Sequence, residues 1–130
     1  MKLDVLLGFL DPRDPKEKAA RRAVVLGEID REGRRYLWVA PATTYFQRKG
    51  VVPSGHVLIQ ACSPCRKGSG FTPDIDILIS VRDAAFVSAD SPWLAEAEEV
   101  GQLNLASDRR IWDRFIEEMK RFQPREVFFD

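Results

Sequence analysis

The spacing of the apolar residues changes once along this chain, and that change limits the folds it can adopt. Through roughly the first two thirds, apolar residues gather in short runs bounded by Gly, Pro, Asp or Ser, a pattern typical of β-strands. In the last third they recur every three or four positions, as on one face of a helix. The sequence therefore predicts about six short strands followed by one amphipathic helix.

The predicted strands are separated by turn signals. Gly33 lies in a short turn between a β-branched run and an aromatic run, which favours a hairpin. We expect one domain over residues 1–130, mainly β, built as a small SH3-like, strongly bent antiparallel barrel with a C-terminal helix. The strands are expected at residues 3–10, 22–30, 35–40, 55–61, 74–80 and 85–88.

The C-terminal part predicts two helical segments of different length. Ser91-Pro92 is expected to open a single helical turn at residues 92–98. The longer helix is expected at residues 107–122, with Ser107 as its N-cap and Pro124 beyond its end.

Composition and charge exclude several classes of protein. Hydrophobic residues make up 45% and charged residues 31% of the chain, which excludes a wholly disordered protein. No apolar run approaches the roughly 20 residues that span a bilayer. Asp4 interrupts the apolar start and no small-residue cleavage site follows it, so we expect a strand of a cytoplasmic protein rather than a signal peptide.

The net charge is zero, but its two signs are unevenly distributed along the chain. Residues 1–70 carry 13 Lys and Arg against 7 Asp and Glu, and residues 71–130 carry 7 against 13. The imbalance of +6 and −6 is compatible with a basic face that meets phosphate. It is equally compatible with two solvated halves that attract each other.

Other residues with reactive side chains give weaker signals. Cys62 and Cys65 form a Cys-x-x-Cys pair that runs into an apparent loop, which favours incidental cysteines over a metal or redox site. His56 is the single histidine and is more often packed than catalytic when it lies in a strand. Asp74 and Asp76 share one face of a predicted strand, where solvated carboxylates are the usual finding. No metal or other cofactor is expected.

The order of motifs in the N-terminal half resembles the MazF/PemK family of growth-inhibiting toxins from bacterial toxin–antitoxin pairs. The resemblance follows four segments: Asp4-Val5-Leu6-Leu7, the charged loop at 11–20, Arg21-Arg22-Ala23-Val24-Val25-Leu26, and Val39-Ala40-Pro41-Ala42-Thr43-Thr44. This chain departs from the family at Leu3, where a glycine is usual, and at Arg22, where a proline is usual. Residues 47–67 have no counterpart that we can match.

This resemblance implies a function and a site. Family members have an SH3-like barrel, act as homodimers, are paired with an antitoxin protein, and cleave single-stranded RNA without a metal. By the match, Arg21 would grip the phosphate and Thr43 would supply a hydroxyl that orients it. Such cleavage also needs a base for the attacking 2′-hydroxyl.

A basic rim beside this site is the expected RNA contact. Tyr45 and Phe46 are candidates for stacking bases, or else belong to the core. The alternative to an RNA-cleaving enzyme is a non-catalytic SH3-like module that binds a protein or a nucleic acid. The candidate RNA-binding residues are Arg13, Lys16, Lys18, Arg48 and Lys49.

Overall fold

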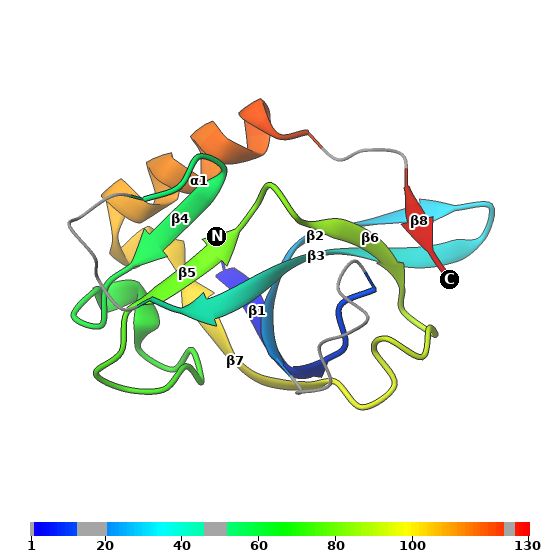
Figure 1. The fold of residues 1–130 in the computed structure, drawn as a ribbon, viewed down its shortest axis with the longest axis horizontal. Coiled ribbons are helices and arrows are strands. Elements are labelled where there is room, and N and C mark those ends of the chain that lie inside the picture. Colours follow the sequence, from blue (N-terminus) through cyan, green and yellow to red (C-terminus); the bar gives the residue numbers. More distant parts are fainter. Residues whose placement is uncertain (1, 13–20, 46–51, 124–126) are drawn as a thin grey trace.

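The computed structural model describes residues 2–12, 21–45, 52–123 and 127–130 (Figure 1). Six strands form one antiparallel path in the order β4-β5-β3-β2-β1-β7, which curls through 196° into a half-barrel. The prediction of a mainly β, strongly bent sheet with one C-terminal helix is confirmed. The elements are β1 (Lys2–Phe9), β2 (Arg21–Arg31), β3 (Arg34–Thr44), β4 (His56–Ile59), the 3₁₀ turn η1 (Pro64–Arg66), β5 (Ile77–Ser80), β6 (Ala85–Ser88), β7 (Glu98–Asn104), the 3₁₀ turn η2 (Leu105–Ser107), α1 (Arg109–Arg121) and β8 (Phe128–Phe129).

The hairpin of β2 and β3 is the longest pairing in the sheet. Its turn residues Glu32 and Gly33 both have positive φ, 53° and 78°, which is the backbone of a type I′ turn. Because this turn type matches the twist of the flanking strands, pairing begins at once with Arg31 opposite Arg34. The hairpin predicted around Gly33 is therefore confirmed.

Strand β3 changes its second partner halfway along its length. Residues 36–39 pair with β6, whereas residues 42–44 pair with β5. The interval between them contains Pro41, which has no N–H to give to a ladder. The two sheet branches that diverge at this point are visible in Figure 1.

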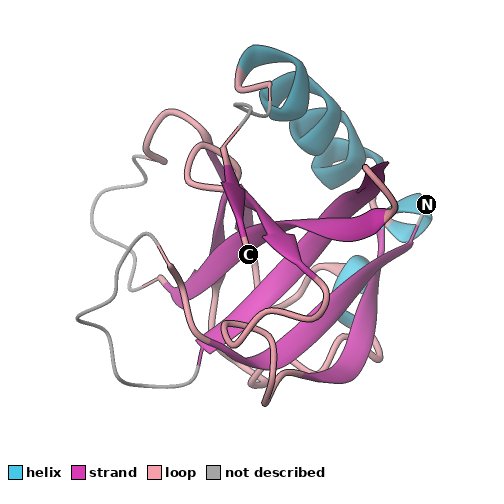
Figure 2. Cartoon of the chain, turned by 90° about the vertical axis from the view of Figure 1, so that its right-hand side faces the viewer, coloured by secondary structure: helices cyan, strands magenta, loops and turns pink. Residues whose placement is uncertain are grey.

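The half-barrel encloses a main core that α1 covers. Val5, Val24, Val57 and Phe115 are fully buried there, and Phe115 comes from the helix. Figure 2 shows α1 lying across one end of the curled sheet. A smaller core, on the other side of β2 and β3, contains Phe9, Ala23, Val39, Ala85, Val87 and Leu94. Within the described ranges, no helix has the length and apolarity that a bilayer crossing requires.

Two expectations about the C-terminal part need correction. The helix begins at Arg109 rather than at 107, because the side chain of Asp108, not Ser107, accepts a hydrogen bond from the N–H of Ile111. Residues 92–98 form successive turns, with bonds such as Leu94 N–H to Ser91 C=O, and the last of them already belongs to β7. Strands β7 and β8 were not predicted.

The strand β8 has only two residues, so side-chain contacts contribute more to its attachment than backbone pairing does. It pairs in parallel with β6, and the Phe128 ring stacks on Phe86 with centroids 5.2 Å apart. The Asp130 carboxylate accepts hydrogen bonds from the Tyr36 hydroxyl and, at 2.8 Å, from Arg34 Nη1. Both hydrogen bonds lower the pKa of Asp130 below its ordinary value, and the bond from Tyr36 has the larger effect.

This lowered pKa predicts that the attachment of β8 depends on pH. A carboxyl whose pKa is lower in the folded state contributes stability above its unfolded value of about 3.9, and that contribution is lost as pH falls through the folded value. We expect Asp130→Asn to shift the amide resonances of Phe128 and Phe129 at neutral pH, measured by NMR. The difference from wild type should vanish at a pH low enough to protonate Asp130. Identical spectra at neutral pH would contradict this role.

The approach of the loop at residues 68–70 to β7 makes a second prediction, about stability. A Cβ added at Gly101 would lie 2.3 Å from the backbone oxygen of Gly68, which accepts the N–H of Gln102. We expect Gly101→Ala to lower the free energy of unfolding by about 2 kcal/mol, measured with denaturant. The control is Gly27→Ala, whose Cβ meets only a Trp38 ring atom at 3.9 Å, and it should change stability by less than about 0.5 kcal/mol. Equal effects would mean that the loop moves away without cost.

Candidate functional site

An open cleft with a volume of about 480 Å³ lies beside the end of the β2–β3 hairpin far from its turn. Side chains alternate along strands, and the cleft residues of β3, β4 and β5 alternate with residues of the main core. The cleft therefore lies on the face of these strands that is turned away from that core. It is lined by Asp11, Arg21, Pro41, Thr43, His56, Ser80 and Asp83.

Arg21 and Thr43, the two residues singled out by the family resemblance, both line this cleft. Arg21 begins β2, and Ala23 of the same strand lies opposite Pro41 of β3. Two residues earlier in β2 and two residues later in β3, the same antiparallel register would bring Arg21 opposite Thr43. Arg21 is half-buried and Thr43 is exposed, so the cleft presents a cation next to a hydroxyl that solvent can reach.

His56, on β4, lines the same cleft. The sequence did not indicate that His56 lies in one cleft with Arg21 and Thr43. His56 pairs with Ser80 of β5 and is half-buried. Its Nδ1 lies 3.1 Å from the carbonyl oxygen of Ser54. Because a carbonyl only accepts, Nδ1 carries the proton in this contact, and in the neutral ring Nε2 is then the acceptor. The imidazole is thus prepared to take a proton at Nε2.

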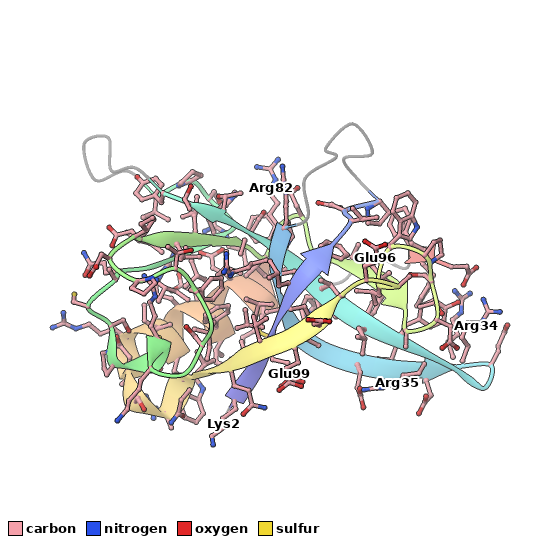
Figure 3. The ribbon with its side chains drawn as sticks, turned by 90° about the horizontal axis from the view of Figure 1, so that it is seen from below. Lys2, Arg34, Arg35, Arg82, Glu96 and Glu99 are labelled. Atoms are coloured by element: carbon pink, nitrogen blue, oxygen red, sulfur yellow. The ribbon has the colours of Figure 1, made fainter. Side chains whose placement is uncertain are left out.

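The loop after β5 fixes the wall of the cleft beside His56. The N–H of Arg82 donates to the carbonyl oxygen of Gly55 at 3.0 Å. Gly55 has φ of +83°, and a Cβ there would lie 2.5 Å from the Cβ of Arg82, so a glycine is required for this approach. Arg82 itself is exposed and projects from the side of the sheet opposite Lys2 and Glu99 (Figure 3).

Ser80 and Asp83 form a closed pair on this wall. The Ser80 hydroxyl donates to Asp83 Oδ2 at 2.8 Å and accepts the N–H of Asp83 at 3.3 Å. Ser80 is only 7% exposed. Its proton is therefore committed to Asp83, and this arrangement suits a structural wall better than a nucleophile.

A helix residue supports the strand that carries His56. Arg114 of α1 donates from Nη2 to the backbone oxygen of His56 at 3.4 Å and pairs with Glu118 Oε1 at 3.1 Å. Glu118 is 1% exposed, and its Oε2 has no hydrogen-bond partner among the described residues. The position of His56 is thus coupled to a buried charge on the helix.

The predicted basic rim lies outside the residues that the structure describes. Phe46 does as well, whereas Tyr45 is half-buried and donates its N–H to the backbone oxygen of Asp76 at 2.8 Å. The RNA-binding role of the rim therefore stays a prediction. The rim residues concerned are Arg13, Lys16, Lys18, Arg48 and Lys49.

The expected shared strand face of Asp74 and Asp76 is wrong. Both precede β5, Asp74 has a left-handed φ of 64°, and Asp76 Oδ1 accepts the N–H of Ala61 at 2.8 Å. Asp74 therefore lies in the turn before the strand, and Asp76 ties this segment to the end of β4 through Ala61. Among the described residues, no three His, Cys, Asp or Glu side chains are grouped to hold a metal ion.

The two cysteines occupy different environments, and both are free thiols. Cys65 is fully buried, and this burial raises the pKa of its thiol. The Ser63 hydroxyl lies 3.1 Å from its sulfur and also donates to Asp108 at 2.6 Å. Cys62 is exposed. The raised pKa makes Cys65 a poor nucleophile, so its surroundings suit a structural residue.

No family model matches the chain, and no curated protein or solved structure matches it. The resemblance to the toxin family therefore rests on the sequence motifs alone.

The ion pair behind His56 gives a testable prediction. Arg114→Met leaves the Glu118 carboxylate buried without its partner, so we expect a loss of about 2 kcal/mol in the free energy of unfolding. Adding Glu118→Gln should restore part of this loss, because it removes the unpaired charge. Denaturant unfolding measures both variants.

The matched control for this pair is Arg109→Met on the same helix. Arg109 pairs with Asp113 at 3.2 Å, but both side chains are largely exposed, so the change should stay within about 0.5 kcal/mol. If Arg114→Met behaves like this control, the buried carboxylate does not depend on Arg114.

Proposed function

We propose that the protein is a metal-independent endoribonuclease that acts on single-stranded RNA. One observation carries the proposal: Arg21, Thr43 and His56, which come from β2, β3 and β4, line the same solvent-open cleft. They bring a permanent cation, a hydroxyl and an imidazole to one place. These are the groups that cleavage by the RNA's own 2′-hydroxyl requires.

The reaction needs no external oxidant or metal. His56 Nε2 takes the proton of a 2′-hydroxyl, whose oxygen attacks the adjacent phosphorus. The bond from phosphorus to the 5′-oxygen breaks, and that oxygen takes a proton from a water molecule, whose hydroxide then removes the proton held by His56 Nε2. The products are a 2′,3′-cyclic phosphate and a free 5′-hydroxyl. Arg21 holds the phosphate and stabilises the charge that grows on it, and Thr43 orients it by a hydrogen bond.

The proposal extends to what the family resemblance implies. It includes diverged membership in the MazF/PemK family, an SH3-like relationship of the half-barrel, a homodimer, and an antitoxin protein as partner in the cytoplasm. The motif order around Arg21 and Thr43 supports it, and the presence of both residues in one cleft agrees with it. A non-catalytic module would use the same cleft for binding and would turn over no RNA.

An RNA-cleavage assay in excess EDTA tests this proposal. We expect the wild type to cut long single-stranded RNA at discrete positions and to leave cyclic phosphate ends. Arg21→Ala and His56→Gln should each slow cleavage about a hundredfold or more, because each removes a transition-state contact or the base. Thr43→Val should cost about tenfold, the value of one hydrogen bond.

Arg110→Ala is the control, because Arg110 is an exposed arginine of α1 that does not line the cleft. It should cleave at the wild-type rate. Intact RNA with folded wild-type protein would overturn the proposal and leave the binding module. Cleavage that persists unchanged in both Arg21→Ala and His56→Gln would show that another agent cuts the RNA.

A further inference from the structure

A second, smaller pocket meets the cleft at Thr43. Its volume is about 150 Å³. Ala42, Phe71 and Ile77 are each less than a tenth exposed and give it an apolar floor. The polar side chains of its rim are Arg22, Thr43, Thr44 and Thr72. A cavity of about this size holds a single aromatic ring in an apolar setting.

Two neighbouring arginines line different pockets: Arg21 lines the cleft and Arg22 lines the smaller pocket. Arg21 and Arg22 are consecutive in β2, so their side chains leave the strand on opposite faces, one toward each pocket. Thr43 lines both. The two pockets therefore meet at the strand end that carries Thr43, and a polynucleotide with a phosphate at Arg21 would reach Arg22 around that end.

The guanidinium of Arg22 is fixed, but only in part engaged. Its Nε donates to the carbonyl oxygen of Gly70 at 2.9 Å. Its two terminal nitrogens have no acceptor among the described residues. A guanidinium held in this way presents a planar pair of donors to a ligand with two adjacent acceptors.

The loop that forms the far side of the pocket is rigidly attached. Gly70 has φ of +77°, and a Cβ there would lie 2.6 Å from the backbone oxygen of Val100. The buried Arg66 donates from Nη2 to the backbone oxygen of Thr72 at 2.7 Å. The pocket is therefore formed before any ligand arrives.

We infer that this pocket is a subsite for a cytosine base of the RNA, next to the scissile phosphate, an inference that rests on the proposed function. The size favours a one-ring base over a purine. Of the two pyrimidines in RNA, cytosine has adjacent acceptors, O2 and N3, on its Watson–Crick edge, which match the two donors of Arg22. In uracil, N3 is itself a donor. The hydroxyls of Thr44 and Thr72 accept from the cytosine amino group.

The test is an NMR titration with each of the four nucleoside 5′-monophosphates, which needs no cleavage. We expect cytidine monophosphate to shift the amides of Gly70, Thr72 and Ile77, and to bind at least fivefold more tightly than the other three. Arg22→Lys keeps the charge but loses the planar pair of donors, so it should bind all four alike. Arg110→Lys, the same substitution at an exposed arginine of α1 that lines neither pocket, should retain the preference.

A second variant tests whether weaker binding by Arg22→Lys comes only from a change in the loop that contains Gly70. Arg22 also contacts Gly70, whereas Thr44 is exposed on β3, and Thr44→Val keeps its shape. We expect this variant to fold as the wild type does and to bind cytidine monophosphate about threefold or more weakly. Unchanged binding in Thr44→Val and Arg22→Lys would overturn the subsite.

The outcomes separate this inference from the proposed function. Selective binding of cytidine monophosphate at the pocket without any RNA cleavage would retain the subsite and overturn the endoribonuclease. RNA cleavage that depends on Arg21, together with equal binding of the four nucleotides or with shifts elsewhere, would retain the enzyme and overturn the subsite. If both hold, mapped cuts should carry cytosine at one fixed position beside the break, and Arg22→Lys should lose that preference.

Discussion

Both cores and both pockets depend on how β3 shares its hydrogen bonds. One edge of β3 pairs with β2 from the hairpin turn onward, so the two strands form one long ladder. The other edge is divided between β6 and β5, with Pro41 in the interval where neither pairs. Since proline gives no N–H to a ladder, the division costs the sheet little there. The sheet can then curl in two directions from one strand.

The position of the cleft follows from that division. Past Pro41, the face of β3 that carries Val39 of the smaller core continues as Thr43, at the far end of the strand. The opposite face continues from Ala40 to Ala42, toward the main core and the second pocket. Polar side chains at the ends of the two central strands therefore border both pockets. A rigid scaffold that presents polar groups at strand ends is a common way to position chemistry.

Local patterns in the sequence predicted the elements whose partners are near in sequence. The hairpin around Gly33 and the helix stripe ending near Phe122 depend on spacing alone, and both are found. Strand β7 was missed because it starts with Glu98 and Glu99 and contains Gly101, so it shows no alternation of apolar residues. Its position is set by β1 and by the loop at residues 68–70, which are far away in sequence. Strand β8 has two residues, too few for any period.

The candidate site was predictable to a similar extent. Arg21 and Thr43 were found through the order of motifs, and the register of β2 and β3 explains why they share a cleft. The sequence singled out His56 as the single histidine, but it did not indicate that His56 lines the same cleft as Arg21 and Thr43. The place of His56 depends on the pairing of β4 with β5 and on the contact between Gly55 and Arg82, both of which are long-range. The second pocket could not be predicted, because Phe71 and Thr72, which line it, lie in a loop that is held by backbone contacts. No sequence motif indicates these contacts.

The helix contributes to the site although no helix residue lines the cleft. β4 ends the strand order, so one of its edges has no strand beside it in the described fold, and such an edge invites pairing with other chains. Arg114 covers that edge by donating to the backbone oxygen of His56. Its charge is balanced by Glu118, whose carboxylate is buried with one oxygen unsatisfied, an arrangement that weakens rather than strengthens a core. An apolar pair would fill this space at lower cost but could not bind the backbone at His56. The burial of this charge is therefore best explained by the position it gives to β4, and through β4 to the imidazole in the cleft.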